Sequence, residues 1–414
     1  MQLHHSRLLL ALILSGIWSL LLLLSQATHL LEKGDQAFSL WAQSQPPQKT
    51  VETPTLALIA IDRLSPERPW PWPRLDFAIA LRALVPCFPQ SVSFETLLHD
   101  RDQRQEAFDT TFAHLVERFD HVIFASAAFQ AGSDLPPPQN LSPIPFEGDI
   151  NSLTPYHSLY WPVETFASNS HVGISNLSLN AAHKPTSIPL FFRWRNQIIP
   201  SLALQSATIQ LRADLSCSSV KLGSHLTLRD SQKKTLRIIP IDEQGMMPLR
   251  HRPLEILTVP FDDFLVYADQ RERGEEAKFN LKSLRQKQVW IGRTDDAIRQ
   301  NAGGEAPVKI QMLAVQNILS SDFIQTLSFG LIALLFMTFA CSVSGLVTLI
   351  TPKISIPISL GIAALYIEMS IILLQSHNLL IPVPAFILLT IGSILSGFAA
   401  RIWEFESETE IAHS

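Results

Sequence analysis

Four long apolar segments divide the chain unevenly, with one near the N-terminus and three in the last quarter. They cover residues 8–27, 323–350, 354–374 and 379–400. A helix needs ~20 predominantly apolar residues to cross the hydrocarbon core of a bilayer. The pattern therefore predicts four transmembrane helices, with the lipid bilayer as their partner.

Between the first two apolar segments, residues 28–322 alternate short apolar runs with amphipathic stretches. The runs predict strands at 56–61, 91–98 and 121–125, and the stretches predict helices at 74–85 and 105–119. Continuous apolar strands that alternate with helices are typical of parallel sheets covered on both faces. We expect an α/β domain with a largely parallel sheet flanked by helices.

The rest of this domain has a less regular pattern. Strands are predicted at 171–176, 188–194, 235–241 and 288–291, and helices at 200–212 and 308–319. Residues 132–166 are rich in Pro, Ser and Asn, so we expect a long loop or a peripheral insertion there. The polar stretch 28–55 is predicted to be a connector. The helix at 308–319 leads almost directly into the second apolar segment.

The short connections between the apolar segments predict the orientation in the membrane. Arg7, Lys353 and Arg401 fall on one side if every segment spans, and the 375–378 loop has no Lys or Arg. Positively charged loops favour the cytoplasm. We therefore expect residues 28–322 to be exported and the tail, 401–414, to be cytoplasmic.

The first apolar segment has a second interpretation, because Ser25-Gln26-Ala27 resembles the cleavage site of a signal peptide. The long apolar run and the weakly basic start favour a retained anchor. Cys87 and Cys217 lie in the exported block, where a disulfide and two buried thiols both fit the sequence.

Polar residues at the predicted strand ends form a candidate ligand site. Asp62 follows the first strand, Arg74 begins the next helix and Glu95 ends the second strand. Ligands of open parallel sheets collect outside the carboxyl ends of the strands. Alternatively, Asp62 caps a turn and Arg74 pairs with an acid. Trp72, held in a Trp-Pro-Trp-Pro segment, is either a stacking surface for the ligand or the cover of a core edge.

One acidic residue, Glu368, stands in the apolar segment 354–374. A carboxylate facing lipid is costly, so Glu368 is a candidate for a role inside the membrane. A hydrogen bond to another helix is the alternative. The small-residue pairs Gly392/Ser396 and Ser393/Gly397 suit packing within the bundle and between protomers alike, so a homo-oligomer stays open.

Composition limits the remaining functions. The net charge is −5, and no basic stripe with interleaved aromatic residues is present, so nucleic acid is not expected as a partner. The chain has no nucleophile-elbow motif, no phosphate-cradling Gly loop and no His or Cys pairs at metal-ligand spacing. We expect neither catalysis nor a cofactor nor a metal.

Several motifs resemble the type-2 CHASE domain, a family of bacterial extracellular sensor modules. The first are Leu58-Ile-Ala-Ile-Asp62 and Trp70-Pro-Trp-Pro-Arg74. Others are Ser91-Val-Ser-Phe-Glu95, Asp109, His171-Val-Gly173, Pro200-Ser-Leu-Ala-Leu204 and Val289-Trp-Ile-Gly292. The resemblance implies a sensor for a small ligand in the bacterial inner membrane. The sequence differs from the pattern of the family at residues 180–187, at Pro307 and at Gln311.

Members of that family usually carry a cytoplasmic output domain after the third C-terminal span. Here only residues 401–414 follow, so the resemblance implies a sensor that signals through a separate partner protein. An alternative function is an accessory membrane component of a transport or ion-coupled system that uses Glu368.

Overall fold

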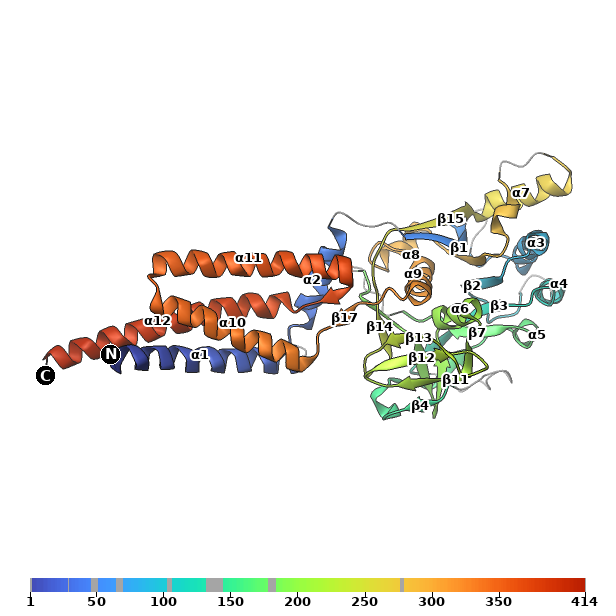
Figure 1. Cartoon of the computed structure of the whole chain (residues 1–414). Coiled ribbons are helices and arrows are strands. Elements are labelled where there is room, and N and C mark those ends of the chain that lie inside the picture. The colour runs from blue at the N-terminus through green and yellow to red at the C-terminus, as the bar shows by residue number, and fades with distance from the viewer. Residues whose placement is uncertain are drawn as a thin grey trace. The chain divides into compact units, whose positions relative to one another are not determined.

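The computed structural model in Figure 1 describes residues 2–28, 30–45, 51–64, 70–102, 106–131, 144–177, 184–275 and 279–413. The chain forms two compact units. We call residues 1–48 with 324–414 the helical unit, and residues 49–323 the α/β unit.

The helical unit is built from five helices in the described part of the chain. They are α1 (Gln2–Ala27), α2 (Glu32–Ser44), α10 (Phe329–Leu349), α11 (Pro352–His377) and α12 (Val383–His413), with the short parallel pair β17 (Gln325–Thr326) and β18 (Leu379–Leu380). Four of these helices contain stretches long and apolar enough to cross a membrane: Ser6–Ala27, Phe329–Leu349, Pro352–His377 and Val383–Trp403. This confirms the four predicted apolar helices, although α10 begins six residues later than expected.

Helices α1, α10 and α12 pack against one another. Side chains bond to the backbone of neighbouring helices: Trp18 Nε1 donates to the Leu388 carbonyl at 2.9 Å and Ser344 Oγ donates to the Ala11 carbonyl at 3.0 Å. A Cβ on Gly392 would collide with the Trp18 ring, and one on Gly397 would lie 2.8 Å from Val347. Both glycines therefore serve close packing within the bundle.

The predicted connector 28–55 contains a helix that was not expected from the sequence, α2 at Glu32–Ser44. Phe38 and Ala42 are one helical turn apart and pack with Leu374 of α11. Gln375 Nε2 also donates to the carbonyls of Ala42 and Gln45, at 3.2 and 3.0 Å. The apolar residues of α2 are too few to stand out in the sequence, and the helix is stabilised by this packing.

A seven-stranded sheet forms the centre of the α/β unit. Its order is β15-β1-β16-β2-β3-β6, with β7 also paired to β3. The strands are β1 (Val51–Ile61), β2 (Ser91–Leu97), β3 (Val122–Phe129), β6 (Ser158–Tyr160), β7 (His171–Ile174), β15 (Leu254–Pro260) and β16 (Gln288–Arg293). All of its pairs are parallel except β3 with β6.

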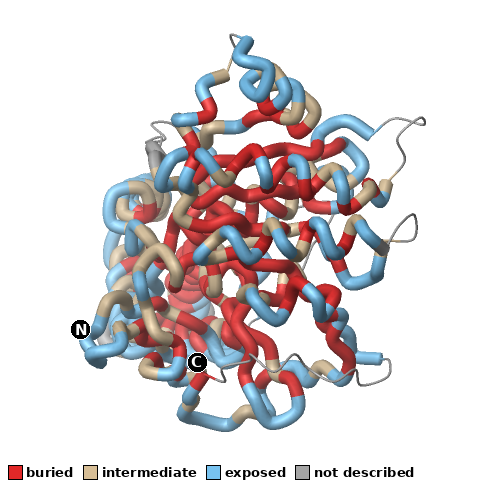
Figure 2. The backbone as a smooth tube through the Cα atoms, turned by 90° about the vertical axis from the view of Figure 1, so that its right-hand side faces the viewer, coloured by how far each residue is buried: buried red, intermediate tan, exposed pale blue. Residues whose placement is uncertain are grey.

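Both faces of this sheet are buried, as the red central strands in Figure 2 show. Along β1, Leu56 and Leu58 enter one hydrophobic core, whereas Ala57 and Ile59 enter the other. Helices α6 (Leu202–Leu211) and α9 (Pro307–Ser320) contribute to the first core, and α3 (Arg74–Leu84), α4 (Glu106–Val116), α5 (Glu164–Ala167) and α7 (Phe261–Glu272) to the second. The continuous apolar run predicted this two-sided burial.

Smaller sheets complete the α/β unit. Their strands are β4 (Phe146–Glu147), β5 (Pro155–Tyr156), β8 (Ser187–Pro189), β9 (Phe191–Trp194), β10 (Gln197–Pro200), β11 (Asp214–Lys221), β12 (His225–Arg229), β13 (Thr235–Pro240) and β14 (Met246–Pro248). Most of their pairs are antiparallel. The mixed α/β class is confirmed, and the pairing over the whole unit is more mixed than the sequence predicted.

The remaining elements are short. They are α8 (Asp296–Gln300) and the 3₁₀ turns η1 (Val85–Cys87), η2 (Ile150–Ser152) and η3 (Leu281–Leu284). Part of the loop or insertion predicted at 132–166 has regular structure: 144–166 contain β4, η2, β5, β6 and the start of α5, and 132–143 lie outside the described residues. Cys87, Cys217 and Cys341 are free thiols.

Candidate functional site

The carboxyl ends of β1, β16 and β2 meet at one edge of the main sheet, because these strands are parallel neighbours. Asp62 follows β1, Arg293 ends β16, and Thr294 N donates to the Ile61 carbonyl at 2.9 Å. Glu95 lies near the end of β2 and close to β16, because a Cβ added to Gly292 would lie 3.2 Å from the Cβ of Glu95. The edge therefore gathers polar side chains from three strands.

Glu95 is the most perturbed acid of this edge. Burial raises its pKa to about 8, although the backbone N–H and the charge of Arg293 oppose the shift. The carboxyl group is therefore mostly protonated near neutral pH, and a protonated carboxyl donates a hydrogen bond. Asp62, by contrast, stands at the surface, with its carboxylate 3.9 Å from Arg63 Nε.

Arg74 is buried in a network of acidic residues. Its Nε lies 3.4 Å from Asp109 Oδ1, and its Nη2 donates to the Asp100 carbonyl at 2.6 Å. Its backbone N–H donates to Asp102 Oδ2 at 2.7 Å, and Asp102 N donates to Asp109 Oδ2 at 2.8 Å. Burial lowers the pKa of Arg74, and the three acids oppose that shift. This geometry supports the pairing interpretation, because Arg74 ties α3, α4 and the turn after β2 together.

The two tryptophans of the Trp-Pro segment differ in position. Trp72 is 3% exposed and packs on Phe261, with ring centroids 5.2 Å apart. Trp70 is partly exposed, and the Arg293 guanidinium lies 5.2 Å from its ring centroid while it forms a bidentate ion pair with Asp295. This supports the core-cover interpretation of Trp72 and makes Trp70 the aromatic residue nearer the polar edge.

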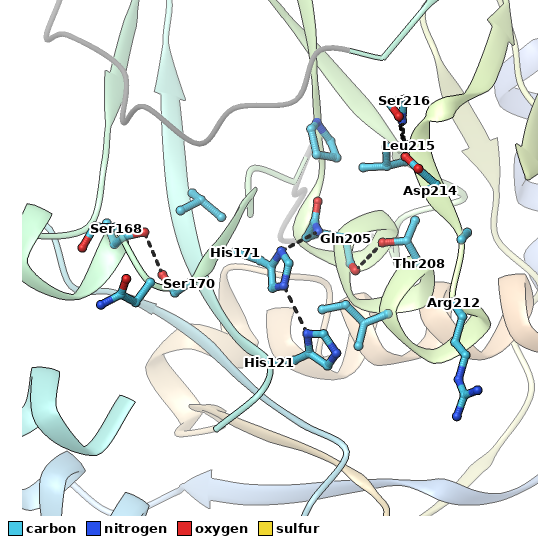
Figure 3. Close-up of a pocket in the computed structure, with 16 residues that line it drawn as sticks. His121, Ser168, Ser170, His171, Gln205, Thr208, Arg212, Asp214, Leu215 and Ser216 are labelled. Carbon is cyan, nitrogen blue, oxygen red and sulfur yellow. Dashed lines mark hydrogen bonds between the residues drawn. The ribbon is translucent and has the colours of Figure 1, made fainter. Parts of the chain in front are cut away.

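A cavity of about 650 Å³ lies at the amino ends of β3 and β7 (Figure 3). It is lined by His121 before β3, residues 167–172 leading into β7, residues of α6 and its flanks from Pro200 to Arg212, and 213–216 at the start of β11. These segments meet because β3 and β7 pair in parallel and α6 packs against β7. We call it the His121–His171 cavity.

Two histidines and a glutamine form a chain of hydrogen bonds in this cavity. His121 Nδ1 is 3.2 Å from His171 Nε2, and His171 Nδ1 is 3.4 Å from Gln205 Nε2. The Gln205 amide N–H donates to His171 Nδ1, so a neutral His171 carries its proton on Nε2 and donates it to His121 Nδ1. Burial lowers the pKa of His171, and His121 lowers it further. The arrangement places the proton of a neutral His121 on Nε2.

Two charged residues also line the cavity. Arg212 is exposed at the end of α6 and makes no ion pair or side-chain hydrogen bond within the described residues. Asp214 accepts from Ser216 N at 2.8 Å and from Ser216 Oγ at 2.6 Å, and these hydrogen bonds lower its pKa. Figure 3 shows the Arg212 side chain extending away from Asp214.

Sequence reasoning did not find this cavity, because it treated His121 as the start of a strand and His171 as the start of a strand and part of a family motif. A usable signal is present, however. Each histidine directly begins a predicted strand of one parallel sheet, and such residues come together when the strands are neighbours.

In the helical unit, Glu368 is exposed on the surface of α11 and makes no hydrogen bond or ion pair within the described residues. A second acid, Asp35 of α2, was missed by sequence reasoning. Gln26 Nε2 donates to its Oδ2 at 3.3 Å, its Oδ1 has no hydrogen-bond partner, and burial raises its pKa to about 6. No cluster of three or more His, Cys, Asp or Glu suited to a metal occurs among the described residues.

Comparison with known proteins gives one family. The model of the CHASE2 domain matches residues 10–347 of the chain. The match begins within α1, covers the α/β unit and ends within α10. No curated protein and no solved structure matches the chain.

Proposed function

Since the chain belongs to the CHASE2 domain family, a family of sensor domains, we propose that it is a membrane-anchored sensor. Its α/β unit binds a small ligand outside the cytoplasm, and the signal passes to a separate partner protein. The observation that carries this proposal is the extent of the family match, from 10 to 347. The matched region thus contains the α/β unit together with parts of the candidate membrane helices that directly precede and follow it in the sequence.

The charge pattern supports an orientation in the bacterial inner membrane with the α/β unit outside. Arg7, Lys353 and Arg401 flank the candidate spans on the side that becomes cytoplasmic. The contacts of α1 with α10 and α12 support a retained first span.

The orientation is tested by single cysteines in a chain whose own cysteines are replaced by serine. A membrane-impermeant thiol reagent added to intact cells should label Gln232→Cys, an exposed position of the α/β unit, and spare Lys353→Cys. Labelling of Lys353→Cys alone would overturn the orientation.

A covalent route supports the passage of the signal. Helix α9 is buried in the core of the α/β unit, where Gln311 Nε2 donates to the Ser175 carbonyl at 3.2 Å. Only residues 321–328 separate the end of α9 from the start of α10. A shift of α9 on ligand binding therefore has a short path to a membrane helix.

The partner is tested by crosslinking in cells from photoreactive residues placed in α12 near Arg401. We expect a signalling enzyme to be captured, and the amount captured should depend on the ligand. Capture of transport proteins only, or of no other protein, would overturn the partner proposal.

The proposed sensor is not an enzyme. The purified protein is expected to turn over none of a broad panel of ester, phosphate, peptide and glycoside substrates. Turnover that survives repeated purification and is abolished by a substitution in the α/β unit would overturn this part of the proposal.

A second candidate function is an accessory component of a transport or ion-coupled system. The exposed carboxylate of Glu368 on an otherwise apolar face of α11 favours it. Replacing Glu368 by Gln distinguishes the two functions. If the protein is a transport component, the variant should lose ion-coupled activity. If it is a sensor, ligand-dependent capture of the partner should stay intact.

A further inference from the structure

We propose that the His121–His171 cavity is the ligand site of this sensor and that its ligands are small organic monocarboxylates with an apolar body. The proposal rests on the sensor function proposed above and adds the place and the chemical class of the ligand. The residues that carry it are Arg212, His121 and the fixed pair Asp214–Ser216.

The size and lining of the cavity suit a small organic molecule. Its volume of about 650 Å³ falls in the ~300–1,000 Å³ range of small-molecule sites. Its lining includes apolar as well as polar side chains, and the apolar ones include Val172, Pro200, Ile209 and Leu215. The lining thus offers an apolar surface for the body of a ligand as well as polar groups for its head.

Two of the residues that line the cavity, Arg212 and His121, offer hydrogen-bond donors. Arg212 brings a planar guanidinium with no partner in the described residues, and its fork matches the two oxygens of a carboxylate. His121 adds an Nε2–H, since the chain through His171 and Gln205 directs its other ring nitrogen to accept. A carboxylate is an acceptor-only group, so either donor can bind it.

The second charged residue restricts the ligand to a single negative charge. Asp214 is held as an anion by the N–H and hydroxyl of Ser216, and Cys217 Sγ lies 3.6 Å from its other oxygen. A dianion such as phosphate would bring two negative charges into a cavity that already holds the Asp214 carboxylate. Arg212 is the one Lys or Arg among the described lining residues to balance them. Domains that recognise phosphorylated peptides use clusters of arginines, whereas this lining holds a single arginine. Charge therefore favours a monocarboxylate over phosphate.

The test is calorimetric titration of the purified full chain in detergent. The probes are propionate, hexanoate and benzoate, with hexanamide and inorganic phosphate for comparison. We expect saturable binding of hexanoate or benzoate, and at least tenfold weaker binding of hexanamide and phosphate. The absence of carboxylate binding up to 10 mM, or tighter binding of phosphate, would overturn the proposal.

Variants locate the site. Arg212→Gln should weaken carboxylate binding about 10- to 100-fold, because a charge-assisted pair is lost. Arg212→Lys keeps the charge without the fork and should give a smaller loss. Arg285→Gln, which removes an exposed arginine elsewhere on the α/β unit, is the matched control and should bind as the parent does.

His121→Phe should weaken binding about fivefold or more through the lost donor. Arg212 is exposed, so its variants test the proposal even if His121→Phe fails to fold. Unchanged binding in all Arg212 variants would overturn the assignment of the cavity. Carboxylate binding that Arg212→Gln removes, together with partner capture that ignores the carboxylate, would support the site and overturn the sensor function.

Discussion

At the scale of single residues, Arg74 and Glu95 follow neighbouring strands of the main sheet but differ in role. Arg74 is a cation that stabilises the fold, and Glu95 is an acid with a raised pKa. Arg74 donates a hydrogen bond to the Asp100 carbonyl in the turn after β2 and forms an ion pair with Asp109. Glu95 is held in its protonated form by burial. Only the folded surroundings distinguish them, because an Arg and a Glu at strand ends look alike as ligand candidates in the sequence.

Arg74→Gln should destabilise the protein by about 3–5 kcal/mol, because it leaves Asp109 charged and buried without its cation. The control is Arg82→Gln. Arg82 pairs with Glu272 at 3.1 Å with both side chains more than half exposed, so its loss should cost less than about 1 kcal/mol. Thermal unfolding of the two variants measures the difference, and equal midpoints would show that the buried network does not stabilise the fold.

Glu95→Gln should change the pH dependence of stability. The folded pKa of about 8 lies above the ordinary value of 4.5, so the parent loses stability as pH rises through this range. The variant has no proton to lose. It should match the parent at pH 5 and exceed it at pH 9 by on the order of 2–4 kcal/mol. Unfolding midpoints at the two pH values measure this, and parallel curves would contradict it.

At the scale of elements, close packing decides which helices and strands are coupled. Gly292 of β16 lies so near α9 that an added Cβ would be 2.7 Å from Val308 Cγ2. Gly392 of α12 lies still closer to its neighbour, because an added Cβ would overlap the Trp18 ring of α1. Both glycines are needed for the approach of a neighbouring element rather than for an unusual backbone conformation.

Gly292→Ala should destabilise the α/β unit by about 1–3 kcal/mol through overpacking. Adding Val308→Ala to this variant should recover part of the loss, because it removes the methyl groups in collision. A double-mutant cycle on unfolding free energies measures this coupling. Strictly additive effects would mean that β16 and α9 are not packed as described.

Gly392→Ala should loosen the helical unit, because the new methyl displaces the Trp18 ring and its hydrogen bond to the Leu388 carbonyl. Gly16→Ala is the matched control, since a Cβ there meets nothing within 4 Å. Thermal unfolding in detergent should show a lower midpoint for Gly392→Ala and an unchanged or higher one for Gly16→Ala. The reverse order would contradict the packing of α1 against α12.

At the scale of the whole molecule, the proposed function depends on the short passage from α9 to α10. Inserting Gly-Gly-Ser-Gly between Thr326 and Leu327 adds a flexible linker. We expect it to reduce ligand-dependent partner capture several-fold while carboxylate binding stays unchanged. Binding and partner capture are measured on the same preparations. Full retention of ligand dependence would show that the signal does not travel through this connection.

The sequence alone determined the number and approximate extent of the apolar helices, the family, and the main-sheet strands β1, β2, β3, β7 and β16, but not β6 or β15. These features follow from local patterns: apolar length, the two-residue period of strands and the spacing of helix faces. The two-sided burial of β1 is one example, since Leu56 and Ala57 alternate between two cores as a continuous apolar run requires.

Tertiary structure alone decided which polar residues meet. His121 and His171 lie 50 residues apart and touch only because β3 and β7 are neighbours. Arg74 forms an ion pair with Asp109 in another helix, which supports the alternative that Arg74 pairs with an acid. Hydrogen bonds and ion pairs depend on distances of a few ångströms between distant segments, and no local period in a sequence records them.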